Sequence, residues 1–407
     1  MKHLYVWVRR TDGTMTVAGR LVTTEPAAAG RFESEFEYSA EWARDTGVFA
    51  LDPVSLPLGG AGRRFRAEQF QPPLGAFDDA LPDDWGRQLL ARALTSEGKA
   101  PSPPQMLLVL RGGGTGALVF TETPAAADMA ETLETRSLSA LLAAASRFEA
   151  GTLPSNDEFR KLLEGSSRVG GARPKALVHD DEGEWVAKFP SRIRDGIHDV
   201  VGLEAICLEL ARRAGLTVPE SRLQAVGRRR ALLVRRLDVI GERGRIHMVS
   251  MRTLCRERPG VFVTSYSDLA AVLAKHSAAP SADLSSLFRY MVFNAAIGNV
   301  DDHLKNFWML ASPSGYRLAP AFDLIPDITG RREHTLAFQY GFACPTRAAL
   351  LAVASDWRVP QAAESIDRVV ASVARLGPTA RKLRVRGPKS LAAIAADVRK
   401  RLALLAG

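Results

Sequence analysis

Cysteine is scarce in this 407-residue chain, and the three that occur, Cys207, Cys255 and Cys344, lie far apart. They form no C-x-x-C pair, which argues against both a disulfide framework and a structural zinc site. We expect reduced thiols that are mostly buried as small apolar groups. Long apolar runs are also missing: no stretch of about 18 apolar residues occurs, so no transmembrane helix is predicted.

A secretory signal is not found at the start, because residues 1–8 are followed at once by Arg9, Arg10 and Asp12. These first residues predict an edge strand, and the expected location is the cytoplasm. The chain length favours two or three packed units. A net charge of +9 permits binding to polyanions but specifies none. The basic run at residues 228–230 separates two apolar segments and is interpreted as a solvated hairpin turn.

The first 125 residues alternate short strand-like runs with turns rich in glycine and proline. A helix is expected to begin at Asp83 or Asp84. The glycine cluster at residues 111–116 lacks the Lys-Ser/Thr ending of a P-loop and predicts a connection before a strand. A change of composition at residues 122–136 suggests a domain boundary. Strands are predicted at residues 5–9, 14–22, 32–38, 54–57 and 117–121.

A second glycine-rich stretch, residues 165–174, precedes two predicted strands at residues 175–178 and 184–190, joined by a tight turn. Glycines without a Cβ let backbone N–H groups close over phosphates, and Lys188 near the end of the second strand would add a positive charge. A nucleotide-binding loop is therefore predicted here. Gly-Gly pairs also occur in ordinary hairpin turns, and this alternative stays open.

The apolar spacing at residues 199–215 predicts a helix that carries Glu204 and Glu209 and stops at Gly215. Both glutamates could be solvent-facing acids. Strands at residues 222–226 and 231–236 would complete a five-stranded lobe, and Asp238 would begin a hinge from which a nucleotide base hangs. The rest is mainly helical, with helices predicted at residues 266–276, 284–297, 347–355, 364–376 and 390–405.

The chemistry is concentrated at residues 298–307, where Asp301 and Asn306 have the Asp-x-x-x-x-Asn spacing of a protein-kinase catalytic loop. Asp301 would accept a proton from an incoming hydroxyl, and the Asn306 amide oxygen would bind magnesium. Asp302 would point elsewhere. After a predicted hairpin, Asp323 would be the second magnesium ligand, and water and phosphate oxygens complete the octahedron.

Two further residues of this loop have open roles. His303 could contact the catalytic acid or a phosphate, and a structural histidine is the commoner alternative. Lys305 could neutralise the transferred phosphate, or it could be a solvated loop lysine. The order of a glycine-rich loop, a strand lysine, a helix glutamate, an Asp-x-x-x-x-Asn segment and a later aspartate predicts an enzyme that transfers phosphoryl groups.

Nearly the whole chain resembles the HipA family of bacterial serine/threonine kinase toxins. Five segments carry this resemblance, and the Asp-Asp-His-x-Lys-Asn-Phe sequence is the most specific part; they are residues 81–86, 167–175, 186–190, 299–307 and 321–323. The family has an α+β, two-lobed protein-kinase-like fold with an additional N-terminal β-rich subdomain. The implied domains are residues 1–125, a kinase N-lobe at 126–237 and a helical C-lobe at 238–407.

The resemblance implies an ATP- and Mg²⁺-dependent protein-serine kinase. By position it makes Asp301 the base, Asn306 and Asp323 the magnesium ligands, and Lys188 the nucleotide lysine, paired with Glu204. The phosphate loop would comprise Val169, Gly170, Gly171 and Ala172. The target class is aminoacyl-tRNA synthetases, and the expected partner is a small helix-turn-helix antitoxin that binds operator DNA.

One position departs from the family pattern. Members often carry a serine directly before the position of Val169, where they phosphorylate themselves, whereas this chain has Arg168 there and Ser166 and Ser167 just upstream. These two serines are candidates for autophosphorylation. Two other functions remain open: a small-molecule phosphotransferase of the aminoglycoside type, and a catalytically silent DNA co-repressor. Intact Lys188, Asp301, Asn306 and Asp323 argue against the silent module.

Overall fold

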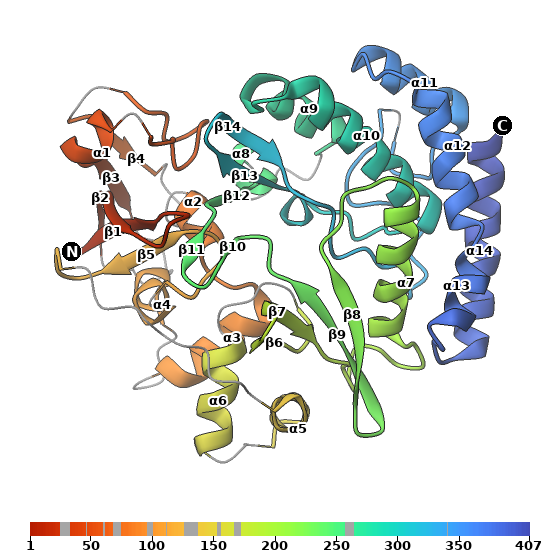
Figure 1. The fold of residues 1–407 in the computed structure, drawn as a ribbon, viewed down its shortest axis with the longest axis horizontal. Helices are drawn as coiled ribbons and strands as arrows, with labels where there is room; N and C mark the ends of the chain where they lie inside the picture. The colour runs from red at the N-terminus through yellow and green to blue at the C-terminus, as the bar shows by residue number, and fades with distance from the viewer. Residues whose placement is uncertain are drawn as a thin grey trace. The chain divides into compact units, whose positions relative to one another are not determined.

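The protein divides into two compact units, seen in the computed structural model of Figure 1. Unit 1 comprises Met1–Ser191, Arg235–Arg258 and Leu310–Pro313, and unit 2 comprises Arg192–Val234, Pro259–Met309 and Ser314–Gly407. The domain boundaries expected at residues 125 and 237 stay predictions.

The structure describes residues 1–24, 33–45, 47–59, 62–67, 75–95, 101–110, 112–125, 137–152, 156–166, 172–256, 264–339 and 341–407.

Unit 1 is built on an antiparallel sheet of five strands in the order β4-β3-β2-β1-β5. The strands of unit 1 are β1 (Lys2–Arg9), β2 (Met15–Thr23), β3 (Ser34–Tyr38), β4 (Arg64–Arg66), β5 (Leu118–Thr121), β6 (Lys175–Asp180), β7 (Gly183–Lys188), β10 (Val239–Ile240), β11 (Gly244–Arg245) and β12 (Met248–Ser250). Its helices are α1 (Ala40–Arg44), α2 (Gly75–Asp79), α3 (Asp84–Leu94), α4 (Pro103–Leu110), α5 (Leu138–Glu149), α6 (Asn156–Ser166) and α8 (Met251–Leu254).

Alternation of side chains determines which face of this sheet is buried. Leu4, Val6 and Val8 of β1 point to one face and are fully buried, as the two-residue period of a strand requires. Phe36 of β3 lies on the same core and meets Phe77 of α2 in an edge-to-face contact with ring centroids 5.1 Å apart. The N-terminal β-rich subdomain therefore has its own apolar core.

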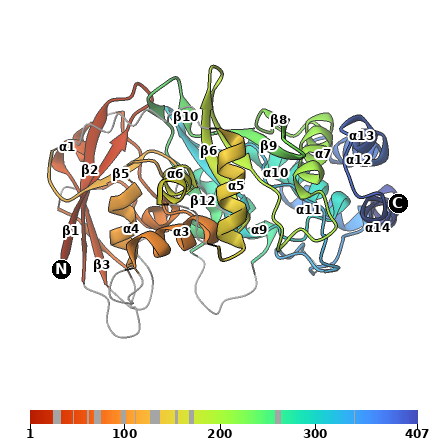
Figure 2. The same cartoon turned by 90° about the horizontal axis from the view of Figure 1, so that it is seen from below.

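Unit 2 is mainly helical. Its helices are α7 (Val200–Arg213), α9 (Tyr266–His276), α10 (Pro280–Ile297), the 3₁₀ turn η1 (Leu304–Asn306), α11 (Arg347–Asp356), α12 (Ala362–Val373), α13 (Leu376–Lys382) and α14 (Pro388–Ala406). Its strands are β8 (Ser221–Val226) and β14 (Gly315–Leu318), while β9 (Arg229–Arg235) and β13 (Trp308–Ser312) are each divided between the units. Figure 2 shows α12, α13 and α14 gathered in one group.

The central element of unit 2 is α10. Every residue from Tyr290 to Ile297 is buried, so the last two turns of this helix are covered on all sides. A helix that is apolar all round belongs inside a protein. The segment that follows α10 is therefore attached to a rigid part of the core.

Most predicted elements are confirmed, and three expectations are wrong. Residues 54–57 form a turn rather than a strand, because Asp52 Oδ1 accepts hydrogen bonds from the backbone N–H groups of Val54 and Ser55. The helix predicted at 364–376 ends early, as α12, since Pro378 would clash with the carbonyl of Ala374 in a continuous helix. Where a lobe of five strands was expected, the described residues contain four strands, β6 to β9.

A buried histidine in unit 1 makes a testable contribution to stability. His247 lies 2.8 Å from the carbonyl oxygen of Leu51 through Nε2 and stacks on Phe49. Burial lowers the pKa of His247 to about 4. Because the unfolded chain takes up a proton near its ordinary pKa of 6.5 and the folded chain does not, stability is lost as the pH falls below that value.

We expect this histidine to lower the free energy of unfolding by about 2 kcal/mol between pH 7 and pH 5. Urea denaturation of the wild type and of His247→Gln at both pH values measures the effect. The variant lacks the titrating group, so its loss of stability over this interval should be smaller by about that amount. Equal losses in the two proteins would contradict the prediction.

Candidate functional site

The site begins where α10 ends. Gly298 terminates the helix in the left-handed conformation, with φ of 74°. A Cβ at this position would lie 2.9 Å from Nε of Arg401, so both the backbone angle and the packing favour glycine. The chain thus leaves the core abruptly and enters the segment that carries Asp301 and Asp302.

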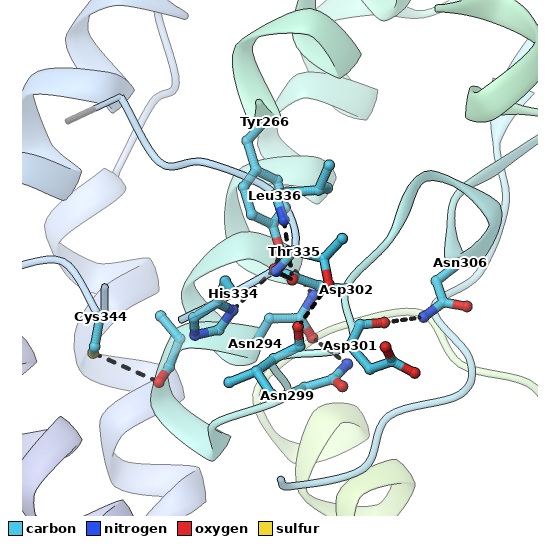
Figure 3. A network of polar contacts seen from close by, with 12 residues as sticks. Tyr266, Asn294, Asn299, Asp301, Asp302, Asn306, His334, Thr335, Leu336 and Cys344 are labelled. Atoms are coloured by element: carbon cyan, nitrogen blue, oxygen red, sulfur yellow. Dashed lines mark hydrogen bonds and ion pairs between the residues drawn. The ribbon is translucent and has the colours of Figure 1, made fainter. Parts of the chain in front are cut away.

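Asp302 is the anchor of this segment (Figure 3). Its carboxylate is fully buried and accepts hydrogen bonds from the Tyr266 hydroxyl at 2.6 Å and from the backbone N–H groups of Thr335 and Leu336 at 2.8 and 3.3 Å. His334 Nδ1 lies 3.0 Å from Oδ2 of the same carboxylate. A buried charge is tolerated only when it is paired and bonded in this way. Asp302 therefore has a structural role, and it points away from Asp301 as predicted.

Tyr266 extends the same network toward α10. Its hydroxyl accepts from Nδ2 of Asn294 at 3.0 Å, and Asn299 Nδ2 donates to Oδ1 of Asn294 at 3.1 Å. Burial, reinforced by the charge of Asp302, raises the pKa of Tyr266 well above its usual range. The hydroxyl is therefore protonated and serves as a donor to the Asp302 carboxylate.

Asp301 lies on the other side of the turn and faces solvent. Its side chain is 66% exposed, and Oδ1 is 3.1 Å from the Arg331 guanidinium. Its backbone carbonyl accepts a hydrogen bond from Nδ2 of Asn306 at 2.7 Å. The carboxylate is therefore exposed to solvent, while the backbone that carries it is held by Asn306.

Asn306 and the Asp323 segment are joined through one hydroxyl. Tyr290 Oη lies 3.4 Å from the carbonyl oxygen of Asn306 and donates to that of Phe322 at 3.0 Å. Burial and the charge of Asp323 raise the pKa of Tyr290. Tyr290 therefore contacts the backbone at Asn306 and at the residue before Asp323, although these two positions lie 16 residues apart in sequence.

The backbone at Asp323 is also unusual. It has φ of 56°, in the left-handed region that side chains other than glycine rarely adopt. Such strain persists where the surrounding structure imposes it, and it is found most often at functional sites.

Because the Asn306 amide nitrogen is bonded to the Asp301 carbonyl, Oδ1 of Asn306 is the end of this side chain that could bind a cation.

Glu204 lies inside unit 2 and not at its surface. It is 2% exposed, whereas Glu209 on the same helix is partly exposed and pairs with Arg213 at 3.0 Å. The interpretation of both glutamates as solvent-facing acids is therefore wrong for Glu204. Its charge contributes to the raised pKa of Tyr290 and, after the larger effect of burial, to that of Cys207.

The two remaining loop residues have no assigned chemistry in the structure. His303 is partly buried and precedes η1, without a capping hydrogen bond from its side chain. The Lys305 backbone carbonyl accepts from the Trp308 indole at 2.6 Å. Their roles stay predictions.

The predicted nucleotide residues of unit 1 are only partly described. Lys188 ends β7, is half-buried and lies opposite Lys175 of β6. Of the predicted phosphate loop only Ala172 is described, and it is partly buried. Val169, Gly170, Gly171 and Ser167 lie outside the described residues, and Ser166 is the last residue of α6.

Asp238 belongs to a buried ion network of unit 1. It pairs with Arg236 at 2.6 Å and accepts from the Gly116 N–H at 2.7 Å, while Arg236 and Arg245 both bind Glu184. Burial opposes ionisation, but the charges of Arg236 and Arg245 hold the pKa of Asp238 below its usual range. Its carboxylate is thus engaged, and any contact with a nucleotide base would fall to the backbone.

The described residues contain no cluster of three or more His, Cys, Asp or Glu side chains able to hold a metal ion. A magnesium site formed by Asp323 and Asn306 would contain only two protein ligands, a carboxylate and an amide oxygen, which are groups that this ion prefers. In the same residues we find no helix with the length and apolarity needed to span a membrane.

Sequence reasoning missed the residues that hold the site in place, namely Tyr266, Tyr290, Asn294 and His334. All are buried. In the sequence, Tyr266, Tyr290 and Asn294 lie on the apolar faces of predicted helices. Because buried polar groups need hydrogen-bond partners, these positions were the signal that a polar network lies beneath the site.

Known proteins resemble parts of this chain in sequence. Residues 167–376 match the family model described as HipA-like C-terminal domain. The Sinorhizobium fredii protein named "Putative kinase Y4mE" is 26% identical over 325 residues, which cover 72% of each chain. A second S. fredii protein, "Putative kinase Y4dM", is 32% identical over 179 residues, 38% of this chain and 41% of its own.

A solved structure shares the fold. HipA of Shewanella oneidensis MR-1, determined as a toxin–antitoxin complex with HipB and operator DNA, superposes with a TM-score of 0.67 at 21% identity, over 98% of this chain and 95% of its own. The predicted α+β fold class, kinase-like with an additional N-terminal β-rich subdomain, is confirmed. Since the family model covers more than half of its residues, the chain belongs to the family defined by the HipA-like C-terminal domain.

Proposed function

We propose that this protein is an ATP- and Mg²⁺-dependent serine/threonine-protein kinase. The observation that carries the proposal is the turn at Asp301, whose carboxylate is exposed and whose backbone carbonyl accepts a hydrogen bond from Asn306, while Tyr290 contacts the carbonyl oxygens of Asn306 and of Phe322, the residue before Asp323. Phosphoryl transfer requires a carboxylate open to the substrate and oxygen ligands for a cation, and we assign these roles to Asp301 and to Asn306 and Asp323. The name of the S. fredii relative supports the same class.

In this proposal Asp301 accepts the proton of the attacking serine or threonine hydroxyl. The hydroxyl oxygen bonds to the γ-phosphorus of ATP, the bond from that phosphorus to the oxygen bridging to the β-phosphate breaks, and ADP leaves. Asn306 and Asp323 would hold Mg²⁺, which neutralises phosphate charge when bound. Lys188, Glu204 and the loop containing Val169 to Ala172 are the proposed nucleotide-binding residues.

We further propose that the kinase is the toxin of a toxin–antitoxin pair. The structural relative was solved with HipB and operator DNA, which supports a small helix-turn-helix antitoxin as partner and operator DNA as its target. The proposed substrate is a protein such as an aminoacyl-tRNA synthetase. A short helix-turn-helix reading frame next to the gene would support this assignment, and co-purification of the two products would test it.

The catalytic proposal is tested with purified protein, labelled ATP, Mg²⁺ and a cell extract. We expect label on a discrete protein band, and its loss with Asp301→Asn. Label on small molecules alone would indicate an aminoglycoside-type phosphotransferase, and ATP binding without any transfer would indicate a silent co-repressor. Peptide mass spectrometry of the same samples shows whether Ser166 or Ser167 is modified.

Removal of one magnesium ligand should change the metal requirement. We expect Asp323→Asn to raise the Mg²⁺ concentration for half-maximal transfer by at least about tenfold, because a neutral amide attracts the cation less than a carboxylate does. Rates measured across a Mg²⁺ titration give this value. Asp327→Asn, nearby on the same segment but bonded to Thr329, is the matched control and should leave the titration unchanged.

A further inference from the structure

A line of polar contacts connects the catalytic turn to the C-terminal helix. His334 is buried, with Nδ1 at 3.0 Å from Asp302 and Nε2 at 3.4 Å from Nη1 of Arg401 on α14. Arg401 is itself buried and pairs with Asp397 one turn earlier on α14 at 2.6 Å. The line of contacts therefore extends from the buried carboxylate of Asp302, next to Asp301 in sequence, to the exposed carboxylate of Asp397 on α14.

The chemistry of arginine determines the state of this histidine. A guanidinium has only donor groups, so Nε2 of His334 must be the acceptor in its contact with Arg401. The ring proton is then on Nδ1, where it is donated to the Asp302 carboxylate. Arg401 thus selects the tautomer that Asp302 requires.

The same contacts hold the backbone of the turn on both sides of Asp301. The Thr335 N–H donates to the Val300 carbonyl at 3.0 Å and the Asn306 amide to the Asp301 carbonyl, while Asp302 is fixed by the bonds described above. Gly298 packs directly against Arg401. A shift of His334 or Arg401 would therefore also shift the backbone segment that carries Asp301, the proposed base.

We propose that His334 and Arg401 are positioning residues for Asp301, and that α14 holds the catalytic turn in its active geometry through them. This inference rests on the proposed kinase function. Neither residue touches the substrate; each acts through Asp302. A displacement of about 1 Å at a reacting group costs on the order of 100-fold in rate, so a small change in this network is sufficient.

Variants of His334 separate positioning from simple structural support. In His334→Asn the amide nitrogen takes the place of Nδ1 and can still donate to Asp302, whereas His334→Leu removes the donor. We expect kcat to fall about 100-fold in His334→Leu and to be restored to within about tenfold of the wild type in His334→Asn, with the KM for ATP nearly unchanged in both. Each kcat is expressed per folded molecule, counted by ATP-binding stoichiometry.

A second pair of variants tests the contribution of α14. Arg401→Met should lower kcat about tenfold. Arg347→Met is its matched control, because Arg347 binds an aspartate, Asp367 at 2.7 Å, and the α14 carbonyl of Leu405 rather than His334. This control should keep the kcat of the wild type. Equal kcat per folded molecule in Arg401→Met, His334→Leu and the wild type would overturn the inference.

Hydrogen exchange of the peptide spanning residues 298–306 gives a readout that does not depend on activity. We expect faster exchange in His334→Leu and Arg401→Met than in the wild type and Arg347→Met. If the wild type transfers no phosphate, the kinase proposal fails, and the exchange comparison alone decides whether this network holds the turn. Unchanged protection in both network variants would reject it.

Discussion

Replacing Asp301 by asparagine is expected to lower kcat by about 10²- to 10⁴-fold, the range that general-base catalysis contributes. The amide keeps the size of the side chain but cannot take the proton of the attacking hydroxyl. Because the Asp301 side chain is 66% exposed and has one ion pair at the surface, the stability of the fold should change by less than about 1 kcal/mol. Initial rates of transfer from labelled ATP and a thermal melt measure the two effects.

The matched control for this substitution is Asp367→Asn. Asp367 is 64% exposed and pairs with a single arginine, Arg347, as Asp301 pairs with Arg331. It lies on α12, outside the proposed site. Full activity in Asp301→Asn would remove Asp301 as the base, and an equal loss in Asp367→Asn would show that the effect comes from surface charge and not from proton transfer.

Removal of the neighbouring carboxylate should act on stability first. We expect Asp302→Ala to lower the free energy of unfolding by about 3–5 kcal/mol, because it leaves the buried donors of Tyr266, His334 and Leu336 without their acceptor. Urea denaturation measures the change. Hydrogen exchange of α10 is measured as well, because chains of this size often unfold in more than one step and the exchange reports the stability of this region alone.

Asp301→Ala provides the comparison at the adjacent position. The two substitutions remove the same group one residue apart, and the exposed aspartate should cost less than about 1 kcal/mol. Asp302→Asn should fall between them, because an amide retains one acceptor. Similar stability for the two alanine variants would mean that the Asp302 network contributes little to the fold.

The sequence was sufficient to propose a catalytic turn because the pattern that suggests it is local. Asp301 and Asn306 lie five residues apart, and the structure joins them through a bond from the Asn306 amide to the Asp301 backbone. The long helices were also predictable, because apolar spacing and capping residues are local features of the sequence. For example, α9 begins at a capping box of Ser265 and Asp268, and α10 ends at Gly298.

Predictions were less accurate where local pattern and local chemistry disagree. Residues 54–57 have strand-forming composition, but the Asp52 side chain bonds its own backbone two and three residues on and turns the chain. Pro378 interrupts an apolar pattern that otherwise continues beyond residue 376. In both places a single residue outweighed the periodicity around it.

By itself, the sequence determined the family resemblance, the α+β class and the pair of residues with kinase-loop spacing. Only the tertiary structure decided which of two adjacent aspartates is exposed, that Glu204 is buried, and that Tyr290, His334 and Arg401 surround the turn. Spacing within one segment is set by the geometry of the chain. Burial and hydrogen-bond partners depend on segments that lie far apart in sequence, up to 99 residues from Asp302 to Arg401, and these meet only after folding.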